Sequence, residues 1–138
     1  MERQIAKLLS ANDTGETGGH QAGILIPRDE ELLSFFPRLD SAAPNPRCHL
    51  RFLDDGGTFW EFAFIYYNNR FFGGTRNEYR LTKMTRFILQ AGLVQGDELL
   101  LSRNNGRYRV TCRRKKDAQA LRNGVLKLGT GWRVIKND

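Results

Sequence analysis

The chain has 138 residues, of which 40% are hydrophobic and 27% charged, the size and usage of one globular domain rather than of a disordered chain. Its 22 Lys and Arg residues against 15 Asp and Glu residues give a net charge of +7, which favours a polyanionic partner, either nucleic acid or an anionic membrane surface. No apolar run approaches the roughly 20 residues of a membrane span, and residues 1–9 lack the apolar segment of a signal peptide.

Short apolar stretches between polar, Gly-containing turns dominate the chain and predict β-strands. In chain order we expect strands at residues 4–9, 21–26, 47–54, 58–67, 97–103, 107–113, 125–128 and 132–135. Helical spacing predicts helices at 28–36 and 82–91, the second capped by Thr82 and stopped by Gly92, and a short third helix at 117–123. About seven strands without a strand–helix alternation predict a mainly β fold, a closed or partly closed barrel.

The turns support the strand predictions, and two polar loops stand out. Residues 54–57 (DDGG) and 104–106 (NNG) are typical of β-hairpin turns. Residues 10–19 (SANDTGETGG) are long for a simple connection. Residues 68–80 (NNRFFGGTRNEYR) are polar, basic, aromatic and Gly-containing, and they interrupt the alternation of the preceding strand. We predict that both segments are loops.

The sequence lacks the usual motifs of a catalytic or metal site. No Asp or Glu is followed two positions later by Lys, the pattern that commonly holds Mg²⁺ in nucleases. His20 and His49 have no metal-ligand spacing, and no nucleophile elbow or phosphate-binding loop is present. We therefore expect no catalytic residue, metal or cofactor. The remaining enzymatic alternative is an unfamiliar metal site using Asp54, Asp55 and Glu61, although turn chemistry accounts for the two aspartates.

The cysteines indicate the compartment. Cys48 and Cys112 are the only two in the sequence and no Cys-x-x-Cys occurs. Two lone thiols without a signal segment are typical of a reducing environment, where cysteine behaves as a small buried hydrophobic residue. We expect a cytoplasmic protein.

The segment 68–86 has the chemistry of base recognition. Arginine pairs bidentately with guanine O6 and N7, and glutamate accepts from cytosine N4, so Arg76, Glu78 and Arg80 offer partners for both bases of a G·C pair. Phosphate binding alone would not call for Glu78, because a carboxylate repels phosphates. The alternative is a solvated loop in which Glu78 pairs with Arg76 or Arg80. Five basic side chains surround this single acid: Arg70, Arg76, Arg80, Lys83 and Arg86.

Two further segments fit a nucleic-acid surface less specifically. The first loop carries hydrogen-bonding side chains and glycines that permit close approach, but its Asp13 and Glu16 argue against a grip on phosphates, and on this loop alone a polar hairpin tip is the simpler reading. The stretch 103–116 is basic, with Arg107, Arg109 and Arg113 on one strand face, which indicates either an ordinary charged outer face or a phosphate-facing flank. The candidates in the first loop are Asn12, Thr14, Thr17, His20 and Gln21.

Two long stretches resemble the amino-terminal effector-binding domain of EcoRII-type restriction endonucleases. They are residues 9–27 (LSANDTGETGGHQAGILIP) and 65–82 (IYYNNRFFGGTRNEYRLT). A third stretch, 81–101 (LTKMTRFILQAGLVQGDELLL), is similar to plant B3 DNA-binding domains. The resemblance implies a seven-stranded open β-pseudobarrel with two or three short helices. It also implies two arms, residues 10–25 and the segment from 68 to just past 80, that clasp the major groove of duplex DNA.

The resemblance assigns roles residue by residue. It implies that His20, Arg76, Glu78 and Arg80 lie at or near base edges. It assigns backbone or positioning contacts with DNA to Arg70, Asn77, Lys83 and Arg86. Three positions depart from the family pattern, since Gly74 and Tyr79 stand where lysines occur and Leu25 where a tyrosine occurs. The remaining DNA contacts that we expect are Asn68, Thr75 and Tyr79, together with Leu25 and Arg107.

The resemblance also implies a biological setting. We expect residues 1–138 to form one non-catalytic domain that binds a CCWGG-type target as a monomer, without membrane or cofactor. A linked nuclease domain, which would hold Mg²⁺, is expected beyond Asp138. DNA bound by this domain would either regulate cleavage or tether the nuclease. The alternative is a basic β-barrel regulatory or protein-interaction module with only non-specific affinity for DNA.

Overall fold

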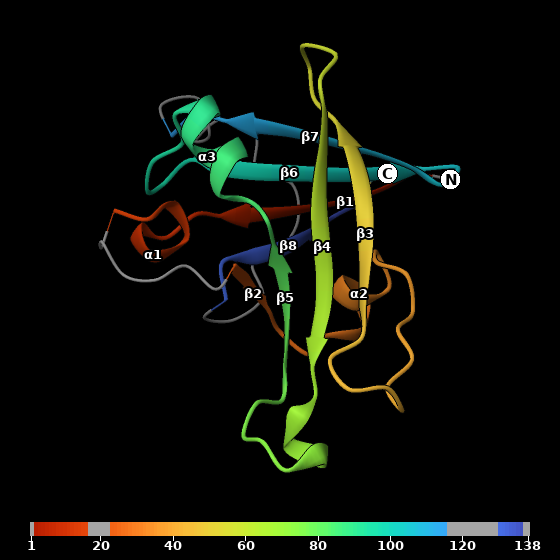
Figure 1. Cartoon of the computed structure of the whole chain (residues 1–138). Coiled ribbons are helices and arrows are strands. Elements are labelled where there is room, and N and C mark those ends of the chain that lie inside the picture. Colours follow the sequence, from red (N-terminus) through yellow and green to blue (C-terminus); the bar gives the residue numbers. More distant parts are fainter. Residues whose placement is uncertain (1, 17–22, 116–129, 137–138) are drawn as a thin grey trace.

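The computed structural model describes residues 2–16, 23–115 and 130–136. The eight strands in these residues form one curled sheet (Figure 1). Its order is β2-β5-β4-β3-β7-β6-β1-β8, and neighbours pair antiparallel except β3 with β7, which are parallel. The strands are β1 (Glu2–Leu8), β2 (Ile24–Ile26), β3 (Arg47–Leu53), β4 (Phe59–Tyr67), β5 (Glu78–Thr82), β6 (Glu98–Asn104), β7 (Arg107–Arg113) and β8 (Trp132–Ile135). The helical elements in these residues are α1 (Ala11–Thr14), α2 (Glu30–Leu33), the 3₁₀ turn η1 (Asn69–Phe72) and α3 (Thr85–Ala91).

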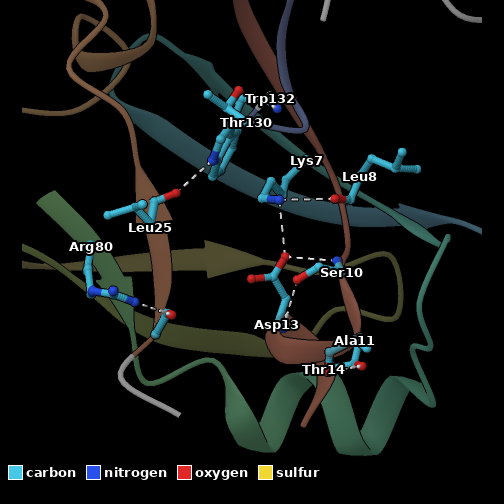
Figure 2. A network of polar contacts seen from close by, with 11 residues as sticks. Lys7, Leu8, Ser10, Ala11, Asp13, Thr14, Leu25, Arg80, Thr130 and Trp132 are labelled. Carbon is cyan, nitrogen blue, oxygen red and sulfur yellow. Dashed lines mark hydrogen bonds and ion pairs between the residues drawn. The ribbon is translucent and has the colours of Figure 1, made fainter. Parts of the chain in front are cut away.

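The sheet forms an open barrel. In Figure 1, β1, β6, β7 and β8 cross β3, β4 and β5 steeply, so the sheet curls around its inner face. The edge strands β2 and β8 form no ladder with each other. Instead, Trp132 Nε1 on β8 donates a hydrogen bond to the Leu25 carbonyl on β2 at 2.9 Å (Figure 2). The predicted mainly β open pseudobarrel is confirmed, with eight described strands instead of about seven.

Alternate strand residues fill the inside of this barrel with aromatic rings. Phe52 on β3 and Phe62 and Phe64 on β4 are at most 2% exposed. The Asp29 side chain caps α2, which fixes the direction in which the following residues enter the core. Phe36 then stacks on Phe64 with 4.3 Å between the ring centroids. The predicted apolar face of the segment 28–36 is therefore confirmed as core, although its helix is shorter than expected.

The two predicted hairpins are confirmed as β3–β4 and β6–β7. The prediction of a loop over residues 68–80 is wrong at its end, because residues 78–80 begin β5, which pairs with β4 on one side and β2 on the other. The prediction of a continuous loop over residues 10–19 is also wrong, because α1 lies within it. The elements predicted at 117–123 and 125–128 lie outside the described residues.

The helix predicted at 82–91 is shorter at its start. Thr82 belongs to β5, and Lys83 has a φ of +64°, so α3 begins only at Thr85. The predicted stop is confirmed, since Gly92 ends α3 in the left-handed conformation. None of the helices in the described ranges is long and apolar enough to cross a membrane.

A buried ion pair joins β6 to β8 across β1. Arg133 Nε donates to Glu98 Oε2 at 3.0 Å and Arg133 Nη2 to Glu98 Oε1 at 2.9 Å, and both residues are at most 1% exposed. Arg113 Nη1 on β7 lies 3.6 Å from the same carboxylate. Because removal of one partner leaves a charge in a low-dielectric site, such a pair resists substitution of either member.

We expect Glu98→Gln to lower the free energy of unfolding by about 3 kcal/mol, because the buried Arg133 loses its counter-charge. Urea denaturation followed by tryptophan fluorescence measures this change. The matched control is Glu61→Gln, which removes an exposed pair with Lys83 and should change stability by less than about 1 kcal/mol. Equal effects of the two substitutions would contradict the role given to the buried pair.

Candidate nucleic-acid interface

The first arm (residues 10–25) is fixed to the barrel where it begins. Ser10 and Asp13 form a capping box around α1, in which Asp13 N donates to the Ser10 hydroxyl at 3.1 Å and Ser10 N donates to Asp13 Oδ2 at 3.0 Å. The same carboxylate oxygen lies 3.1 Å from Lys7 Nζ on β1, and both side chains are 9% exposed (Figure 2). A charge pair largely removed from water therefore holds α1 against the sheet.

The end of the first arm is fixed as well. Gly23 has a φ of +90°, and a Cβ there would lie 2.6 Å from the Leu81 carbonyl oxygen on β5, so only glycine fits. The Gly23 carbonyl accepts a hydrogen bond from Arg80 Nη1 at 3.0 Å (Figure 2). Two residues later, the Leu25 carbonyl accepts the bond from Trp132. Arg80 of the second arm and Trp132 of the barrel thus both bind the end of the first arm.

The second arm (residues 68–80) starts from a buried amide. Asn68 is fully buried, its Nδ2 donates to the carbonyls of Ser41 at 3.0 Å and Ala43 at 2.8 Å, and its Oδ1 accepts from Asn45 N at 2.7 Å. These three bonds use both donors and the oxygen of the side chain to hold the loop before β3. The Asn68 side chain therefore anchors the arm, and a contact of Asn68 with DNA stays a prediction.

Three charged side chains on the return of this arm form one network. Glu78 Oε1 lies 3.2 Å from Arg76 Nε, and Glu78 Oε2 lies 2.9 Å from Arg80 Nε. The Arg76 guanidinium also lies over the Tyr67 ring, 3.8 Å from its centroid. The ion pairs of the solvated-loop alternative are therefore present. They engage only the Nε atoms of both arginines, and among the described residues the two Nη atoms of Arg76 have no hydrogen-bond partner.

The strand register puts this network on the outer face of the sheet. Arg80 on β5 stands opposite Leu25 on β2, and Glu78 stands opposite Tyr67 on β4. Because residues two apart share a face of a strand, Glu78 and Arg80 point the same way. Leu25 is 48% exposed beside Arg80. The end of the first arm and the return of the second arm therefore lie side by side on the outer face.

Two other predicted contacts point inward. The Tyr79 ring stacks on Tyr66 with 4.3 Å between centroids, and burial raises the pKa of the Tyr79 hydroxyl above its ordinary range. Asn77 Oδ1 accepts from the Tyr66 hydroxyl at 2.7 Å and contacts Arg28 Nη2. Arg28 also lies over the Tyr66 ring. Tyr79 and Asn77 thus support the arm from behind.

The structure places the remaining candidates of the first arm away from the network or does not describe them. Thr14 is buried, with its hydroxyl donating to the Ala11 carbonyl at 3.1 Å, and Asn12 is exposed on the same helix. Thr17, His20 and Gln21 lie outside the described residues. Of the first arm, the structure describes residues 10–16 and 23–25.

The basic candidates outside the arms lie in two places. Lys83, paired with Glu61 at 3.3 Å, and Arg86 line a groove of about 570 Å³ between the start of β4 and α3. Arg107 is far from both arms. It pairs with Asn104, which stands opposite the start of β1. The first arm leaves the other end of β1, roughly 20 Å away along the strand. In Figure 1 the β6–β7 turn lies on the right and α1 on the left.

Asp54, one of the three acidic residues of the proposed metal alternative, serves a turn. Asp54 Oδ1 accepts from Gly56 N at 2.9 Å and Thr58 N at 2.8 Å, and its Oδ2 accepts from Trp60 Nε1 at 2.9 Å. These bonds, led by that from Trp60, lower the pKa of Asp54. In the described part of the chain no group of three or more His, Cys, Asp or Glu side chains is placed to hold a metal ion.

Sequence reasoning missed the residues that support the network. Tyr67 reads as an ordinary strand aromatic, and Arg28 as the start of a helix. A usable signal existed only for Gly23, since a glycine just before an apolar strand marks a close backbone approach. Tyr67 becomes visible only through its register opposite Glu78.

An open, mainly β barrel with this strand order and few helices is a B3-like fold. The structure titled Arabidopsis FUS3-DNA complex matches with a TM-score of 0.61 and 20% identity, over 79% of this chain and 94% of that chain. The family model described as "Restriction endonuclease EcoRII, N-terminal" matches residues 3–117. The type II restriction enzyme EcoRII of Escherichia coli is 45% identical over 84 residues, 56% of this chain. The chain belongs to the EcoRII N-terminal family, and the match covers 20% of the length of that enzyme.

We expect Asn68→Ala to lower the free energy of unfolding by about 2–3 kcal/mol, because it removes three hydrogen bonds between the buried Asn68 side chain and the backbone of Ser41, Ala43 and Asn45. Thermal or urea unfolding measures the change. Thr75→Ala, at an exposed position of the same arm, is the control and should stay within about 0.5 kcal/mol of the wild type. An Asn68 variant as stable as the control would show that the amide is not an anchor.

Proposed function

We propose that this chain binds duplex DNA sequence-specifically, as the non-catalytic target-recognition and effector domain of a type II restriction endonuclease. The two arms enter the major groove, and the target is of the CCWGG type. Support comes from membership of the EcoRII N-terminal family and from a fold shared with a protein solved in complex with DNA.

The network of Arg76, Glu78 and Arg80 carries this proposal. Each arginine uses Nε for Glu78. Within the described residues this leaves the Nη groups of Arg76 and Arg80 Nη2 to donate to guanine O6 and N7. A carboxylate has about four lone-pair sites, so Glu78 can also accept from cytosine N4. The ion pairs hold both guanidinium groups in place before DNA arrives, which lowers the entropy cost of ordering them on binding.

The structure also bears on the mode of binding. The first arm carries Asp13 and Glu16, whereas residues 69–77 of the second arm carry two arginines and no acid. Arms that differ this much cannot read the two halves of a near-palindrome equivalently. We therefore propose that one copy of the domain binds one duplex asymmetrically. In this proposal the domain acts in the cytoplasm without a metal or cofactor, and a linked nuclease domain supplies the Mg²⁺ chemistry.

We expect selection from a random duplex pool, at the ionic strength of a cell, to yield one preferred sequence. Arg76→Ala should weaken binding to it by about 1–3 kcal/mol and flatten the preference, because one base contact is lost. Fluorescence anisotropy with selected and scrambled duplexes measures both effects.

The matched control for Arg76→Ala is Arg107→Ala, which lies far from both arms. Any loss in this variant should affect all duplexes equally and reduce the salt slope by at most about 1. Uniformly weak binding of the wild type to every duplex would contradict the proposal and favour a protein-interaction module instead.

We expect a one-to-one complex, because the two arms are unlike and belong to one chain. Native mass spectrometry of the domain with the selected duplex counts the copies bound. A second measurement with a duplex carrying two selected sites should show two copies. A dominant complex of two proteins on a single site would contradict asymmetric binding by a monomer.

A further inference from the structure

Two neighbouring aromatic side chains at the turn of the second arm have no place in the proposed network. Phe71 and Phe72 lie on η1 and are 64% and 50% exposed. Large apolar side chains that stand together in a polar surface mark an interaction site more often than a single exposed one does. These two therefore need a partner that covers them.

The turn that carries them is built to hold one shape. The side-chain oxygen of Asn69 accepts a hydrogen bond from Arg76 N at 2.7 Å, and the backbone carbonyl of Asn69 accepts one from Gly74 N at 2.7 Å. Arg70 N donates to the backbone carbonyl of Arg76 at 2.9 Å. A Cβ at Gly74 would lie 2.6 Å from Asn69 Cγ, so this glycine permits the close approach. A hydrogen-bonded turn thus holds both phenylalanines in exposed positions.

The surroundings of the pair indicate the chemistry of that partner. Arg70 lies 5.7 Å from the Phe71 ring centroid, and residues 69–77 hold two arginines and no acid. An apolar pair with a cationic rim fits the major groove of DNA, where thymine 5-methyl groups are apolar and the phosphates on either side are anionic. Arg76, at the base of this turn, connects the pair directly to the network with Glu78 and Arg80.

We propose that Phe71 and Phe72 contact thymine 5-methyl groups in the major groove, next to the base pairs read by Arg76 and Arg80. The second arm thereby reads an A·T pair by apolar contact in addition to G·C pairs by hydrogen bonding. This inference rests on the proposed function, and it adds two specificity residues and a base class to it.

The test uses the duplex selected by the wild-type chain, with each thymine replaced in turn by deoxyuridine, which lacks only the 5-methyl group. For the wild type we expect one or two positions at which this replacement weakens binding about fourfold, the factor for removing one methyl group from an apolar contact. In the variant Phe71→Ala/Phe72→Ala, affinity for the thymine duplex should fall about tenfold, and the same positions should become insensitive to deoxyuridine. Both side chains are exposed, so the variant should unfold at the wild-type temperature.

Leu89→Ala is the control. Leu89 is 70% exposed on α3, an element that lies away from η1 of the second arm in Figure 1, and its removal should change neither affinity nor the deoxyuridine profile. A double variant that keeps the wild-type deoxyuridine profile contradicts the inference. So does a wild type that is insensitive to deoxyuridine, together with a double variant that binds both kinds of duplex equally weakly. A selected site without thymine contradicts it too. If Arg76→Ala still abolishes the preference in these cases, the proposed function stands and only the thymine contact fails.

Discussion

The arrangement of the two arms depends on the hydrogen bonds that the Arg80 guanidinium donates. This group binds Glu78 within its own arm and the Gly23 carbonyl at the end of the other arm. The second bond is possible because Gly23 approaches β5 more closely than any side chain would allow. One side chain therefore sets the charge pattern of the outer surface and the spacing of the arms at once, so neither can shift without the other.

The other anchors have the same character, because they are polar bonds withdrawn from water. Lys7 with Asp13 holds the start of the first arm, Trp132 with the Leu25 carbonyl holds its end, and Asn68 holds the start of the second arm. Buried polar groups are costly when unpaired, so each anchor favours one geometry over its neighbours. Recognition of a rigid duplex benefits from this, since side chains already in place lose less entropy on binding.

Local patterns were enough to predict the class of fold, the two hairpins and the Gly92 stop, because each depends on residues close in sequence. The resemblance of residues 9–27 and 65–82 to a known family identified the arms. What local patterns could not provide was register. β5 has polar residues at 78 and 80 and reads as a loop until its pairing with β4 and β2 is known. The same missing register hid Tyr67 as the support of Arg76.

The position of β1 has a consequence for how the chain folds. Ile5 pairs with Leu101 and Val134, which lie 96 and 129 positions further along the sequence. Pairings over such separations must close large loops before they contribute energy, and proteins rich in them fold slowly. During synthesis β1 has no sheet partner until most of the domain has left the ribosome. The first arm, which extends from β1, would therefore be among the last parts of the molecule to reach its working shape.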